Sequence, residues 1–288
     1  MANLYFAKIN VNGEIYKVYN DELSIDSIID KLIVNISTEK SIVLPDNKGQ
    51  IKFITLINNL DKRYVSGRLI RIFQDDIQIY EKAKDDVIDL TNKDLARTCT
   101  FFFDGKSEIV GFTTGRYFGI SQFCKYFEEL LNEHTAPGCF NVTLIKDTDA
   151  FRNKLNRLKT VNKVNIRIVA KNSCDDDLAE WYANNDTMED MEANQAEITY
   201  ESKGKQSGGL NMNNAYISSI IDSLGLGYGR MTAIGVNAEG IKDQVVSDKD
   251  APMKIKIADN NKTSMPYIND RTKDLIPWVL SKMRKDKL

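Results

Sequence analysis

The first forty residues combine two kinds of hydrophobic spacing. Residues 4–11 alternate in the manner of a strand, with the apolar odd-numbered positions on one face. Asn12-Gly13 is a turn signal, so a second strand is expected over residues 14–19. After Ser24, a favourable N-cap, isoleucines and leucines recur every three or four positions. The pattern therefore predicts a hairpin, then a helix that packs on a sheet.

The next part of the chain is rich in short runs of branched and aromatic residues. The strands predicted from these runs cover residues 41–44, 51–57, 64–73, 77–80, 99–103 and 108–112. Asp104-Gly105 is a hairpin turn signal, and we expect the three phenylalanines before it in the core. A helix follows over residues 120–134. Ala136-Pro137-Gly138 then breaks the pattern and predicts a domain boundary.

Helix and strand patterns are mixed beyond this boundary. The predicted strands are 140–145, 164–170, 196–201, 229–237 and 253–258, and the predicted helices are 149–159, 211–224 and 274–285. Residues 175–194 indicate an acidic helix or lid. The expected fold class is α+β, with a β-rich domain containing two packed helices over residues 1–137 and a mixed α/β domain over residues 138–288.

The composition is that of a soluble globular protein. Of 288 residues, 42% are hydrophobic, and 39 basic residues nearly balance 41 acidic ones. No apolar run reaches the ~18–20 residues that a membrane helix requires, and the N-terminus lacks the layout of a signal peptide. We therefore expect a cytoplasmic protein.

Cysteine and histidine usage limits the chemistry. The 4 cysteines are widely spaced without a C-x-x-C pair, which does not suit a zinc ribbon. His134 is the only histidine, so histidine-rich metal sites are excluded. Its position at the end of a predicted helix favours a positively charged helix-terminal side chain over a catalytic base. We expect no cofactor.

Charge is distributed unevenly along the second half. Residues 151–171 hold seven basic residues and no acidic ones, whereas residues 175–201 hold ten acidic residues and no basic ones. The basic run could hold nucleic-acid phosphates, pair with the acidic segment, or form a solvated face. The nucleic-acid contacts predicted from it are Arg152, Lys154, Arg157, Lys159, Lys163 and Arg167.

A loop over residues 203–209 joins a predicted strand to a predicted helix. Its glycines carry no side chains, so the loop could approach a phosphate backbone closely. It lacks the G-x-x-x-x-G-K-[ST] order, which disfavours a nucleotide triphosphatase. The loop residues predicted to contribute are Gly204, Gly208 and Gly209 for close approach, with Lys203 and Lys205 as phosphate contacts.

Glu201-Ser202-Lys203 has the E-x-K form used by metal-dependent nucleases, in which acids bind Mg²⁺ and the lysine orients the attacking water. Such a site needs a second carboxylate nearby, for which Asp186, Asp190 and Glu197 are candidates. A Mg²⁺-dependent nuclease that uses Glu201 and Lys203 is therefore an alternative function.

Several stretches resemble the RexA-like phage-exclusion proteins, which are linked to abortive infection. The resemblance follows the order of elements over about half the chain and is carried by residues 100–105, 109–112, 164–169, 200–204 and 210–211. It implies a two-domain, dimeric, DNA-binding component of an exclusion system without established catalytic residues. One departure is that residues 186–192 are acidic here where RexA has basic residues. We therefore expect DNA contacts at the basic run and the loop instead.

The expected function is a non-catalytic phage-defence component that binds DNA or an infection-derived complex. It would act with a partner protein, as a cytoplasmic homodimer. The second alternative, beside the nuclease, is an inhibitor or adaptor whose acidic segment, residues 175–201, docks on a basic protein.

Overall fold

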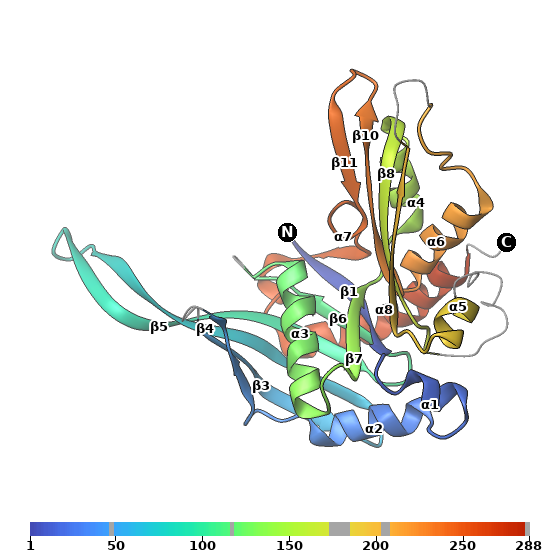
Figure 1. Cartoon of the computed structure of the whole chain (residues 1–288). Helices are drawn as coiled ribbons and strands as arrows, with labels where there is room; N and C mark the ends of the chain where they lie inside the picture. Colours follow the sequence, from blue (N-terminus) through green and yellow to red (C-terminus); the bar gives the residue numbers. More distant parts are fainter. Residues whose placement is uncertain (46–48, 116–117, 173–184, 203–207, 286–288) are drawn as a thin grey trace.

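The computed structural model describes residues 1–45, 49–115, 118–172, 185–202 and 208–285 (Figure 1). Its larger sheet is antiparallel and has 8 strands. Seven of them follow the order β12 (Lys254–Ile257), β1 (Ala2–Val11), β6 (Ile109–Thr113), β5 (Asp86–Asp104), β4 (Tyr64–Glu81), β3 (Gln50–Asn59) and β2 (Ser41–Val43). The eighth, β7 (Phe140–Leu144), pairs with the second half of β1.

Helices cover both faces of this sheet. Because successive side chains of β1 point to opposite faces, Ala7 joins a core with α2 (Ile25–Asn35) and α3 (Ile120–His134). Phe6 joins a separate core with α8 (Met265–Lys285). The α3 core contains a cluster of aromatic rings, in which Phe112 and Phe123 stack with centroids 3.8 Å apart. The three consecutive phenylalanines, 101–103, are all buried, which confirms their predicted place in the core.

The smaller sheet is also antiparallel, with the order β11 (Lys242–Val246), β10 (Gly229–Asn237), β8 (Leu158–Val169) and β9 (Gln195–Glu201). Helices α4 (Thr148–Leu155) and α6 (Ala215–Gly225) pack on one of its faces. The short elements α5 (Asn185–Asp190), α7 (Ser247–Asp250) and η3 (Asp259–Asn261) complete the structure together with α1 (Ile15–Tyr19). Two sheets with helices on their faces confirm the predicted α+β class. Among the described helices, none is long and apolar enough to cross a membrane.

Segments beyond residue 137 complete the larger sheet. Strands β7 and β12 both pair with β1, and α8 covers one face of the same sheet. The larger sheet thus contains strands from both predicted domains, 1–137 and 138–288. Whether these two parts fold independently stays a prediction.

A buried polar contact joins the two sheets. Asn172, just beyond β8, donates from Nδ2 to the carbonyl of Ile9 at 2.9 Å and accepts from the amide of Val11 at 2.7 Å. It also contacts Glu108, whose carboxylate lies 2.9 Å from the ammonium of Lys8. Buried polar groups need such partners, so this network fixes β8 against β1.

The strand expected over residues 14–19 is wrong, because this segment forms the helix α1. Ile15 is buried in the core of the smaller sheet, and the Tyr16 hydroxyl hydrogen-bonds the carbonyls of Met188 and Ala193. The edges of β1 are already paired with β6, β7 and β12. Contacts made far along the chain therefore override the local turn signal.

The two strands predicted over residues 64–73 and 77–80 are one continuous strand, β4. It pairs with β5 far beyond the point where β3 ends, so the two strands leave the body as a long arm (Figure 1).

Candidate nucleic-acid interface

The smaller sheet has one apolar and one polar face. In β8, Val164 and Ile166 are buried in the core that includes α4 and α6. Strand alternation therefore places Lys163, Asn165 and Arg167 on the opposite face, where they are half-buried. This polar face is the one that a ligand can reach.

Two arginines lie side by side on the polar face. In the strand register, Arg167 of β8 is directly opposite Arg230 of β10, and Glu197 of β9 lies on its other side. Like charges directly opposite each other destabilise a sheet. Neither guanidinium forms an ion pair within the part of the chain that the structure describes. The arginine pair is therefore suited to binding an anion such as phosphate, because each guanidinium group can donate two parallel hydrogen bonds to it.

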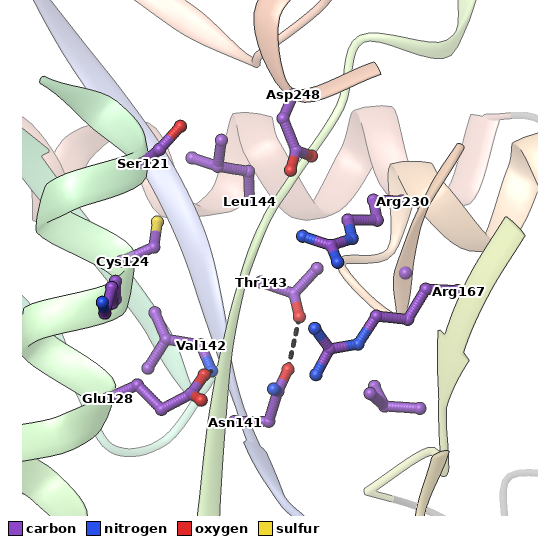
Figure 2. Close-up of a pocket in the computed structure, with 13 residues that line it drawn as sticks. Ser121, Cys124, Glu128, Asn141, Val142, Thr143, Leu144, Arg167, Arg230 and Asp248 are labelled. Atoms are coloured by element: carbon purple, nitrogen blue, oxygen red, sulfur yellow. Dashed lines mark hydrogen bonds between the residues drawn. The ribbon is translucent and has the colours of Figure 1, made fainter. Parts of the chain in front are cut away.

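A pocket of about 390 Å³ lies between this arginine pair and α3. Figure 2 shows Arg167 and Arg230 pointing from one side toward β7, with the α3 side chains on the other side. Strand β7 forms the middle of the lining through residues 141–144. The pocket thus spans both sheets, and its walls come from five elements, α3, β7, β8, β10 and α7.

Glu128 of α3 faces the arginines across the pocket (Figure 2). Its Oε2 accepts a hydrogen bond from the amide of Val142 at 2.8 Å. Burial raises the pKa of the Glu128 carboxyl, while the Val142 amide and the positive charges of Arg167 and Arg230 act in the opposite direction. The pocket therefore offers guanidinium donors on one wall and a carboxylate acceptor on the other.

A buried lysine supports the base of the pocket. Lys146 is 1% exposed, and its Nζ donates to the carbonyls of Leu144 at 2.6 Å and Gly229 at 2.7 Å. The same Nζ lies 2.9 Å from Oδ1 of Asp248, which lines the pocket. Lys146 compensates the charge of Asp248, and Lys125 of the lining is paired with Glu129. The two arginines therefore outnumber the remaining carboxylate, Glu128, and leave the lining with an excess of positive charge.

Cys124 also lines the pocket. Burial raises the pKa of the Cys124 thiol, so the reactive thiolate is disfavoured. Among the described residues, no three His, Cys, Asp or Glu side chains converge in a way that could hold a metal ion. The two guanidinium groups give the pocket donors that suit an anion.

A sequence profile of a domain of unknown function, DUF4747, matches residues 3–276. This match spans nearly the whole chain, including both sheets and the pocket. The chain belongs to the DUF4747 family. No curated protein matches the sequence.

The structure of this DUF4747 chain divides the predicted basic run between two sides of the smaller sheet. Helix α4, with Arg152 and Lys154, lies on the apolar face, and Arg152 forms an ion pair with Asp222 of α6. Arg167 and Lys163 lie on the polar face. The two remaining predicted contacts, Arg157 and Lys159, are exposed where β8 begins. One flat ligand therefore cannot contact all six residues at once.

The predicted loop lies mostly outside the described residues, as do Lys203, Gly204, Lys205 and the first part of the acidic segment, residues 175–184. Gly208 is exposed. Gly209 has a φ of +87°, and an added Cβ would lie 2.7 Å from the carbonyl oxygen of Val161. Glycine is thus required at 209 by the close approach to β8 itself.

Of the residues considered for a nuclease site, Glu201 and Glu197 share the polar face with Lys163 and Arg167, their direct cross-strand neighbours. Asp190 lies in α5, away from these strands in sequence. A Mg²⁺-dependent nuclease activity that uses Glu201 and Lys203 stays a prediction.

Sequence reasoning selected Arg167 but missed Arg230 and Glu128. Arg230 stands between the buried residues Gly229 and Met231, so strand alternation could have placed it on a polar face. Its position beside Arg167 depends on the pairing of β10 with β8, which no local pattern gives. Glu128 lies on a helix from the other half of the chain.

Proposed function

We propose that this DUF4747 protein is a non-catalytic DNA-binding protein, with Arg167 and Arg230 as its central phosphate contacts. The observation that supports it is the pair of neighbouring guanidiniums without a described ion-pair partner at a pocket. An anion between them removes the repulsion and accepts their hydrogen bonds. Lys163 lies on the same face beside Glu201, and Lys125 lines the pocket beside Glu129, so the two arginines carry the unpaired positive charge.

The size of the pocket suggests how DNA would be bound. A volume of about 390 Å³ holds a nucleotide-sized group and is far too small for a duplex. DNA would therefore present its sugar–phosphate backbone, or a single strand, to the pocket. Phosphate contacts of this kind give affinity without reading sequence.

The biological setting proposed is phage exclusion, as the resemblance to RexA-like proteins implies. In that role the protein binds DNA or an infection-derived complex in the cytoplasm and acts with a partner protein. The DUF4747 match itself carries no function, so the binding activity is the part to test first.

The test is fluorescence anisotropy of labelled duplex and single-stranded DNA over a series of salt concentrations. The double variant Arg167→Gln/Arg230→Gln should lose about two phosphate contacts. The plot of log K for duplex binding against log salt concentration should then become less steep by about 1.8. A matched control is Arg157→Gln, an exposed arginine directly before β8 and about ten residues from Arg167 along the chain. It should change binding much less.

Two outcomes would contradict the proposal. Equal binding by the wild type and the Arg167/Arg230 variant would remove these residues from the interface. Cleavage of the DNA when Mg²⁺ is added, lost on Glu201→Gln, would show that the protein is a nuclease instead.

A further inference from the structure

The arginine pocket offers hydrogen-bond acceptors as well as its two guanidinium donors. Glu128 of α3 reaches the edge of β7, where its Oε2 accepts a hydrogen bond from the amide of Val142 at 2.8 Å. Each oxygen of an ionised carboxylate has two lone pairs, so the carboxylate keeps acceptor capacity beyond this one bond. A ligand in the pocket can therefore donate hydrogen bonds to Glu128.

Asn141 supplies a donor beside this carboxylate. It precedes Val142 in β7, and strand alternation points its side chain away from the α3 core that holds Val142. Its Oδ1 accepts from the Thr143 hydroxyl at 2.7 Å, so the amide group offers Nδ2 as a donor. Figure 2 shows Asn141 and Thr143 between Glu128 and the two arginines. This wall of the pocket thus combines a donor with the two oxygens of a carboxylate.

A gap separates the arginines from Glu128. Burial raises the pKa of the Glu128 carboxyl, whereas the positive charges of Arg167 and Arg230 lower it, so both charges act on it through space. Neither guanidinium forms an ion pair with Glu128 in the described part of the chain. The volume of about 390 Å³ is within the range of small-molecule sites. One ligand can therefore place an anion at one end and donors at the other.

The four DNA bases differ in the groups at their Watson–Crick edges. Guanine presents two neighbouring donors, N1–H and N2–H, with the acceptor O6 beside them. Adenine and cytosine each place an acceptor next to the amino donor, and thymine has one donor between two acceptors. An ionised carboxylate only accepts hydrogen bonds, so guanine alone can donate two parallel bonds to it.

We propose that the arginine pocket binds one guanine nucleotide, with its phosphate on Arg167 and Arg230 and its base on Glu128. The N1–H and N2–H groups donate to the carboxylate, and O6 accepts from Nδ2 of Asn141. The phosphate position rests on the proposed DNA binding, whereas the base contacts go beyond it. In duplex DNA the same edge of guanine is paired with cytosine, so the source is a free nucleotide or an unpaired base of a single strand.

The first test is calorimetric titration of the full chain with the four deoxynucleoside monophosphates. The wild type should bind dGMP about 10-fold or more tightly than dAMP, dCMP and dTMP, because a bidentate base contact discriminates by roughly that factor. The inosine nucleotide dIMP lacks the N2 amino group and should bind more weakly than dGMP. The analogue of dGMP with carbon in place of N7 keeps the whole edge and should bind like dGMP. These comparisons need no variant, so altered folding cannot affect them.

A variant tests the carboxylate itself. Glu128→Gln should remove the preference for guanine, because the new amide keeps one acceptor oxygen but replaces the other oxygen with a donor. The matched control is Glu133→Gln, an exposed glutamate of the same helix outside the pocket lining, which should keep the preference. Arg167→Gln/Arg230→Gln should instead weaken all four nucleotides to a similar extent. Thermal unfolding checks that each variant is folded.

The second test uses fluorescence anisotropy of labelled single strands. An oligothymidine with one central guanine should bind more tightly than oligothymidine alone, and Glu128→Gln should abolish the difference. Binding of DNA without a guanine preference in either test would overturn this inference and leave the proposed DNA binding intact. A preference for dGMP without binding of any DNA would support the guanine site and contradict the proposed DNA binding. A guanine preference that survives in Glu128→Gln would also overturn the inference.

Discussion

The buried lysine under the arginine pocket gives a prediction with a calculable size. In Lys146→Met, the side chain keeps its length but loses two charge-assisted hydrogen bonds, to the carbonyls of Leu144 and Gly229. Each such bond is worth about 1.5–3 kcal/mol. Asp248 also loses its ion-pair partner, although its side chain is 29% exposed and so keeps part of its hydration. The apolar Met side chain offsets some of these losses.

We therefore expect Lys146→Met to lower the free energy of unfolding by about 3 kcal/mol. For a chain of this size, that loss corresponds to a decrease in melting temperature of about 6–10 °C. The assay is thermal unfolding followed by circular dichroism, with urea unfolding as a second measure.

The control is the second variant Lys146→Met/Asp248→Asn. Removing the unpaired carboxylate should recover part of the lost stability, so the double variant should be more stable than Lys146→Met alone. A change below about 0.5 kcal/mol for Lys146→Met would refute the reasoning, because it would mean that the two carbonyls and Asp248 do not depend on the ammonium group.

Two further predictions concern stability. Gly235→Ala should lower the melting temperature markedly, because the new Cβ would lie 2.0 Å from the carbonyl oxygen of Thr160. In the control Gly119→Ala, the new Cβ meets no atom within 4 Å, so the melting temperature should stay nearly unchanged. Equal melting temperatures of the two variants would contradict this prediction. Burial lowers the pKa of His134, so the unfolded chain binds a proton more readily, and the free energy of unfolding should fall as the pH drops below about 6.5. Because His134 is the only histidine, His134→Gln should reduce this pH dependence, and an identical dependence in both proteins would disprove it.

The lowered pKa also corrects the interpretation of His134 as a charged helix terminus. The side chain is 5% exposed, and its ring stacks on Phe53 with centroids 5.9 Å apart. Position at a helix end favours the protonated form, but burial disfavours it more strongly here. The sequence located the residue correctly and could not give its environment.

Local patterns determined most elements of this protein. The helix α2 was predictable from its 3.6-residue spacing and its Ser24 cap, which accepts a hydrogen bond from the amide of Ser27 at 3.1 Å. The phenylalanine strand and its hairpin turn were equally clear. These signals depend on neighbouring residues only, so they are present in the sequence itself. The α+β class follows from them.

Tertiary structure decided the site and the exceptions. The arginine pair exists because β10 pairs with β8 in one register, and the pocket exists because β7 carries the chain back to β1 beside α3. Helix α1 replaces a predicted strand because its partners lie more than 150 positions along the chain. Pairing and packing between distant segments depend on the whole chain at once. A local pattern therefore fixes which face of a strand is polar, and only the folded structure fixes what that face meets.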